Sequence, residues 1–150
     1  MQYHLQKCNS LSVLTRSHTP HAFNYTLKGH VLESVNTAKY LGITLSSNMS
    51  WDTHINNITV KANKFLSFLH RNLQIKREET KSLAYKSMVR SNLEYCSSIW
   101  APHTKQHIDK IESVQRRAAR YVTKMYHNTS SVTSMLNHLN WNTLENKKHQ

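Results

Sequence analysis

The sequence is poor in the residues from which several common kinds of site are built. It has two glycines among 150 residues, and neither belongs to a glycine-rich loop that would cradle a phosphate. Its two cysteines, Cys8 and Cys96, are too few for a disulfide framework, which fits a reducing compartment. No apolar run approaches the roughly 18 residues of a membrane-spanning helix, and the N-terminus lacks the apolar stretch of a secretory signal. We therefore expect an intracellular protein, nuclear or cytoplasmic, that is not secreted.

Acidic residues and paired metal ligands are scarce as well. The two aspartates stand near predicted helix starts, and Glu78-Glu79 is the only close pair of acids. Polymerase or nuclease chemistry by two metal ions needs clustered carboxylates, because hard cations take oxygen ligands. His103 and His107 give one spaced pair, whereas a closed zinc site needs four ligands. The sequence therefore predicts no catalytic centre and no cofactor in this chain.

Positive charge is the strongest compositional signal. Lysine and arginine outnumber the acids 20 to 8, which gives a formal net charge of +12. Residues 61–90 hold eight basic and two acidic side chains, and residues 105–124 hold six and two, whereas the first 60 residues have a net charge of only +2. A basic excess on helical segments favours a polyanionic partner. We predict nucleic acid, with an anionic membrane surface second and a merely solvated basic surface as the alternative.

The first third of the chain has the pattern of strands. Apolar and polar residues alternate over 23–27, and Lys28-Gly29 then suits a tight hairpin with glycine at positive φ. Val31 begins the returning strand, and residues 40–45 make a further short β run. These features predict a small antiparallel sheet.

The apolar period then becomes helical. Spacings of three and four predict helices over about 51–69, 78–90 and 104–122, with a shorter one near 130–139 and a new start near Leu144. Thr104 suits the N-cap of the third helix. The predicted fold class is therefore α+β: a small antiparallel sheet or hairpin over residues 8–45, followed by a bundle of three to four helices.

Several stretches, in order, carry a resemblance to a known family. They are 39–45 (KYLGITL), 49–51 (MSW), 61–64 (KANK), 68–73 (FLHRNL), 84–91 (AYKSMVRS), 93–102 (LEYCSSIWAP), 111–122 (IESVQRRAARYV) and 129–136 (TSSVTSML). In this order and spacing the chain resembles the reverse transcriptases of non-LTR (LINE-type) retrotransposons, most closely the jockey and CR1-like groups. Each stretch is weak by itself, and the resemblance rests on their succession over about 110 residues.

The resemblance implies a role for each part of the chain. Residues 1–48 would be the end of the polymerase palm, with Tyr40, Leu41 and Gly42 in a hairpin like the one that grips the primer end. Lys7 would lie near the outgoing pyrophosphate. Residues 49–150 would be the helical thumb, truncated at the C-terminus. The catalytic aspartate motifs of the family, which would hold Mg²⁺ in a complete enzyme, have no counterpart here, so we expect no polymerase activity from this chain alone.

A thumb holds a duplex and lets it slide, which calls for contacts to phosphates more than to base edges. The cations on the predicted helices are the candidates for these contacts. They are Lys61, Lys64, Lys86, Arg90, Arg116, Arg117, Arg120 and Lys124.

Two other interpretations stay open at this point. One is a stand-alone basic helical protein without polymerase ancestry, which binds nucleic acid or serves as an adaptor for an acidic protein. The other is a relic reading frame of a decayed element. The sequence does not determine the oligomeric state.

Overall fold

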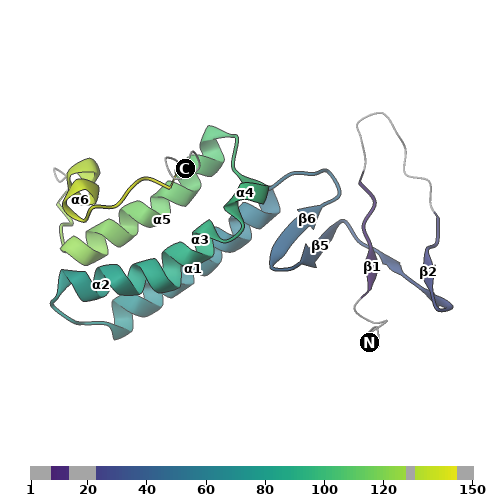
Figure 1. Ribbon diagram of the computed structural model, residues 1–150, viewed down its shortest axis with the longest axis horizontal. Helices are drawn as coiled ribbons and strands as arrows, with labels where there is room; N and C mark the ends of the chain where they lie inside the picture. The colour runs from purple at the N-terminus through teal and green to yellow at the C-terminus, as the bar shows by residue number, and fades with distance from the viewer. Residues whose placement is uncertain (1–7, 14–22, 128–130, 145–150) are drawn as a thin grey trace. The chain divides into compact units, whose positions relative to one another are not determined.

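The computed structural model describes residues 8–13, 23–127 and 131–144. The chain divides into two compact units, Met1–His54 and Ile55–Gln150. Among the described residues, the first holds six short strands and the beginning of the first helix, and the second holds the rest of the helices (Figure 1). This arrangement confirms the predicted α+β class. What the parts 1–48 and 49–150 do remains a prediction.

The strands form three separate pairs where one antiparallel sheet was predicted. β1 (Asn9–Ser10) pairs in parallel with β4 (Glu33–Ser34), and β2 (Thr26–Leu27) pairs antiparallel with β3 (His30–Val31). β5 (Thr37–Tyr40) and β6 (Ile43–Ser46) form the third, antiparallel pair. Strands of two to four mostly exposed residues bury too little apolar surface to hold a continuous sheet together.

Two tight turns close the antiparallel pairs. Lys28 and Gly29 have φ angles of 50° and 79°, so the predicted Lys28-Gly29 hairpin is confirmed. Leu41 and Gly42 have φ angles of 46° and 85°. Positive φ at both central residues is the geometry of a two-residue turn whose twist matches that of the strands. The stretch 40–45, predicted as one strand, therefore holds the end of β5, a turn at Leu41 and Gly42, and most of β6.

The first long helix, α1 (Asp52–Asn72), begins where the sequence predicts. The Ser50 hydroxyl accepts a hydrogen bond from the Asp52 amide at 3.1 Å. Asp52 stands in the first turn and His70 and Arg71 in the last, so both ends complement the helix dipole. The helix extends three residues beyond the predicted apolar stripe.

The second helical stretch is longer than predicted. α2 (Glu78–Tyr85) continues through a π-helical turn, η2 (Lys86–Arg90), into α3 (Ser91–Glu94). Cys96 then takes a left-handed conformation with φ 52° and leads into α4 (Ser97–Trp100).

α5 (Lys105–Thr123) confirms the third predicted helix, and the Thr104 hydroxyl caps it by accepting from the His107 amide at 3.4 Å. α6 (Val132–His138) confirms the shorter one. The element predicted to start near Leu144 would run through residues 145–150, which lie outside the described residues.

The core of the helical unit lies between α5 and the α2–α3 stretch. Tyr85, Val89, Val114 and Ala118 are fully buried there. The segment after α6 packs against one side of this core, because the Trp141 ring stacks on Tyr85 with ring centroids 4.3 Å apart. This packing holds the helices together and so sets the positions of the side chains on their outer surface.

Candidate nucleic-acid interface

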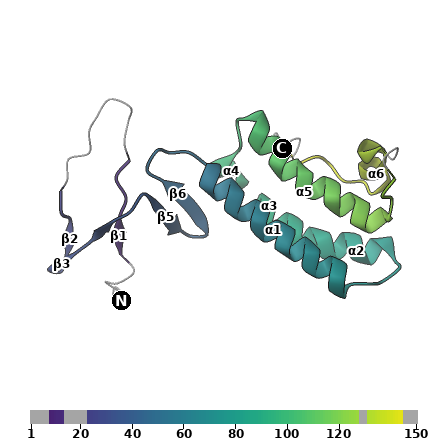
Figure 2. The same ribbon diagram turned by 180° about the vertical axis from the view of Figure 1, so that it is seen from behind.

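The helices α1 and α5 run parallel and side by side in both views (Figures 1 and 2). Two contacts define their register: Lys110 Nζ donates to Asn56 Oδ1, and Arg117 Nη1 donates to Asn63 Oδ1 at 3.0 Å. Both pairs are separated by 54 residues in the sequence, and they lie seven residues apart on each helix. A shared seven-residue repeat keeps the same side of each helix against its neighbour. The amides on α1 therefore hold the cations of α5 at fixed points along the shared surface.

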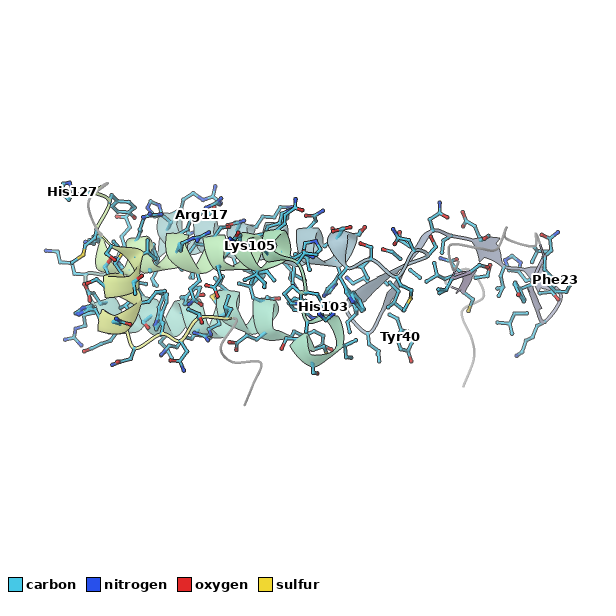
Figure 3. The ribbon with its side chains drawn as sticks, turned by 90° about the horizontal axis from the view of Figure 1, so that it is seen from above. Phe23, Tyr40, His103, Lys105, Arg117 and His127 are labelled. Carbon is cyan, nitrogen blue, oxygen red and sulfur yellow. The ribbon has the colours of Figure 1, made fainter. Side chains whose placement is uncertain are left out.

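Five cations gather along this surface, and we call them the basic seam. They are Lys64, Arg71, Lys110, Arg117 and Arg120. All are exposed except Arg120, which is half-buried. Figure 3 labels Arg117 on the helical unit, where its side chain is exposed. Seven helical residues rise about 10.5 Å, so Lys110 and Arg117 leave the backbone of α5 about two turns apart.

Two neighbouring hollows open along the basic seam and share Ser67 and Arg71. The first has a volume of about 350 Å³ and lies between the second half of α1 and the end of α5, next to Tyr126. The second, of about 340 Å³, lies over Val60 and Lys64. None of the described residues that line the two hollows is acidic. The surface is therefore concave and positive, as a site for a polyanion requires.

Tyr121 fixes the floor of the first hollow. Its hydroxyl donates toward two carbonyl oxygens at the end of α1, those of Leu69 at 3.2 Å and Leu73 at 2.9 Å. The ammonium group of the buried Lys81 lies 4.9 Å from the centre of the Tyr121 ring. Burial, and then the charge of Lys124, lower the pKa of Lys81. The tyrosine thus contacts α1, α2 and α5, and these contacts fix the position of its ring.

The other predicted cations fall outside the basic seam. Lys61 is exposed on α1, with its ammonium 5.9 Å from the Phe65 ring, and Lys86 is exposed on η2. Arg116 donates to the Asp109 carbonyl at 3.2 Å, about 100° around α5 from Arg117. Lys124 is the C-cap residue of α5, and its charge contributes to the lowered pKa of Lys81.

The prediction that Arg90 faces a phosphate is wrong. Its side chain is buried, and its Nε donates to Glu94 Oε1 at 2.7 Å. The sequence pattern suggested a helix end at Arg90, where a cation would point into solvent. The helical stretch instead continues to Glu94 and places a carboxylate one turn ahead.

The predicted primer-grip-like residues form the tip of the β5–β6 hairpin. Tyr40 and Leu41 are strongly exposed, at 66% and 72%, and Gly42 completes the turn. Figure 3 shows Tyr40 pointing away from its hairpin. Their contact with a primer stays a prediction. Lys7 lies outside the described residues.

Sequence reasoning missed Arg71, Lys110 and Tyr126 as parts of this surface. The repeat of Asn56 and Asn63 opposite Lys110 and Arg117 was a usable signal, because residues seven apart share a helix face. It indicates an interface only once α1 and α5 are known to be neighbours and parallel.

Two searches of the described ranges bear on other kinds of site. No three side chains of His, Cys, Asp or Glu in residues 8–13, 23–127 and 131–144 lie close enough together to hold a metal ion. In the same residues, no helix has both the length and the apolar character needed to cross a membrane.

Comparisons with known proteins give one informative similarity. No family model and no solved structure matches the chain. The chain is 26% identical over 91 residues to the "Probable RNA-directed DNA polymerase from transposon X-element" of Drosophila melanogaster. The alignment covers 59% of this chain and 10% of that protein, so the chain spans about a tenth of its relative. This similarity supports an origin related to transposon reverse transcriptases.

Proposed function

We propose that the helical unit binds the sugar–phosphate backbone of a nucleic-acid duplex along the basic seam. The observation that carries the proposal is the parallel pairing of α1 and α5, which places four cations around two hollows and a fifth, Lys110, against Asn56, without an acid among the described residues that line the hollows. Guanidinium and ammonium groups bind phosphates without reading base sequence. Such a surface holds a duplex and still lets it slide.

The fixed position of Arg117 favours this function over a merely solvated surface. Asn63 accepts one of its five N–H groups and leaves the others for a ligand. A guanidinium that is already oriented loses less conformational entropy when it binds a phosphate. The same argument applies to Lys110, which Asn56 holds.

The similarity to a transposon polymerase suggests where this binding belongs. We propose that residues 49–150 correspond to the thumb of a non-LTR (jockey or CR1-like) reverse transcriptase, and that the hairpin with Tyr40 at its tip contacts the primer end. In this proposal the chain binds and positions a template–primer duplex. Polymerisation and its Mg²⁺ ions belong to catalytic aspartates of the complete enzyme.

A salt series tests the proposal. The purified chain is titrated with blunt RNA–DNA and DNA–DNA duplexes at several salt concentrations, and binding is followed by fluorescence anisotropy. About five phosphate contacts would give a slope of log affinity against log salt near −4.5. A slope near zero, or no binding at low salt, would contradict the proposal and favour an adaptor for another kind of partner.

A further inference from the structure

We propose that the first hollow, between the second half of α1 and the end of α5, takes one unpaired nucleotide of a strand that leaves the duplex. The inference rests on the proposed function, since the basic seam would hold the neighbouring duplex. It adds a second ligand class, an unstacked base, to the backbone contacts.

The size of the hollow suits a single nucleotide. Its volume of about 350 Å³ is in the lower part of the range for small-molecule pockets, about 300–1,000 Å³. A base pair with its two sugars and phosphates would not fit into it. The hollow is also open to solvent, and Arg71, Arg117 and Arg120 of the basic seam line it, so a strand can enter while still attached to a duplex.

The charges of the hollow would receive the phosphate of that nucleotide. Arg71 comes from α1, and Arg117 and Arg120 come from α5, so three guanidinium groups from two helices converge on one space. Arg117 is held in place by Asn63 at 3.0 Å. Arginine binds phosphate through two parallel hydrogen bonds, which gives both strength and orientation.

The rings of the hollow would receive the base. Tyr126 lies just beyond the end of α5 and is 59% exposed, so its ring offers a face to solvent. The His70 and Tyr121 rings, 5.5 Å apart, also line the hollow, and Leu66 adds an apolar wall. Bases stack on aromatic side chains in proteins that bind single strands, whatever their sequence.

The combination of rings and cations determines the ligand class. An inorganic anion would need the arginines alone, whereas an apolar small molecule would need only the rings and Leu66. A base inside a duplex is paired along one edge and stacked on both faces, so neither face is available to Tyr126. An unpaired nucleotide presents a phosphate and a free base face together.

The experiment compares four DNA duplexes of the same sequence by fluorescence anisotropy. One is blunt, one has a short 5′ overhang, one has a 3′ overhang, and one has an abasic overhang that supplies phosphates without bases. We expect an overhang with bases to bind about tenfold more tightly than the blunt duplex, because one base would stack on the aromatic rings of the hollow. The abasic overhang should bind like the blunt duplex.

Two variants make the test specific. Tyr126→Ala should reduce the ratio of overhang to blunt affinity to near one, and Tyr126→Trp should preserve the ratio. Phe68→Ala removes another exposed ring on α1, which does not line the hollow, and should also preserve it. Circular dichroism verifies that each variant is folded.

The outcomes separate this inference from the proposed function. If duplexes bind with a steep salt slope but overhangs give no advantage, or if Tyr126→Ala keeps the advantage, the nucleotide site is wrong and the basic seam stands. An abasic overhang that binds as well as a normal one would show that only phosphates are recognised, and would overturn the inference too. If no duplex binds at low salt, both proposals fail.

Discussion

His54 joins the β5–β6 hairpin to the first turn of α1. Its Nδ1 accepts a hydrogen bond from the Thr44 amide at 3.2 Å, and its side chain is 2% exposed. Burial lowers the pKa of His54 below its ordinary value near 6.5. The unfolded chain therefore takes up a proton at His54 more readily than the folded chain does. The stabilising contribution of neutral His54 is complete above pH 6.5 and is lost as the pH falls through the lower pKa of the folded state.

We predict that the free energy of unfolding decreases between pH 7 and pH 5, and that His54→Asn weakens this dependence. The Asn side chain offers an oxygen near the position of Nδ1 but does not titrate. Urea unfolding of both proteins at the two pH values measures the effect. Subtracting the pH dependence of the variant from that of the unmodified chain removes the contribution of the other histidines. Equal pH dependence of the two proteins would contradict the assigned role of His54.

Single residues differ in how far the sequence reveals their roles. Thr104 is recognisable because an N-cap depends only on neighbours three residues away. Arg117 and Arg90 look alike in the sequence, yet one is exposed beside Asn63 and the other is buried against Glu94. Which side of a helix faces solvent depends on the helices packed against it, and those partners are distant in the sequence.

At the scale of elements, residues 139–144, which follow α6, stabilise the packing of the helices. Trp141 is 4% exposed, stacks on Tyr85 of α2, and donates from Nε1 to the Ser82 hydroxyl at 3.0 Å. Gln115 of α5 donates to the Asn142 carbonyl at 3.0 Å. The segment thus contacts both α2 and α5, although it is neither helix nor strand itself.

Replacing Trp141 with Ala should therefore lower the free energy of unfolding by about 3–5 kcal/mol, the range for large buried aromatics. Ile99→Ala is the matched control, because Ile99 is 59% exposed on α4, and surface changes of this kind usually alter stability by less than about 0.5 kcal/mol. Urea unfolding followed by circular dichroism measures both. A loss for Trp141→Ala as small as that of the control would mean that the segment after α6 does not stabilise the bundle.

The long helices were predictable from the sequence and the strands only in part. Apolar residues repeat along α1 and α5 for five turns or more, so local pattern is enough to identify them. The strands are two to four residues long, and such pairs depend on turn geometry and on distant partners. The parallel pairing of β1 with β4 joins residues 24 apart and has no local signal. The π-helical turn η2 likewise has no sequence pattern that we can identify.

At the scale of the whole molecule, net charge and charge position make different predictions. A formal charge of +12 attracts any polyanion, and this attraction would weaken with each positive charge removed, wherever it lies. The basic seam predicts that a few positions dominate, because contacts between α1 and α5 hold Lys110 and Arg117 in fixed positions. The sequence shows the excess charge, and only the parallel packing of the two helices shows where it is organised.

The most direct measurement compares two double charge reversals that change the net charge equally. Arg117→Glu with Arg120→Glu alters the basic seam, and Lys76→Glu with Lys86→Glu alters two exposed lysines outside it. The salt slope of duplex binding should fall from about −4.5 to about −2.7 for the first variant, because about two of five phosphate contacts are lost. The second variant should keep the slope of the unmodified chain. Equal losses in both variants would show that the total charge binds the nucleic acid and would contradict an organised interface on α1 and α5.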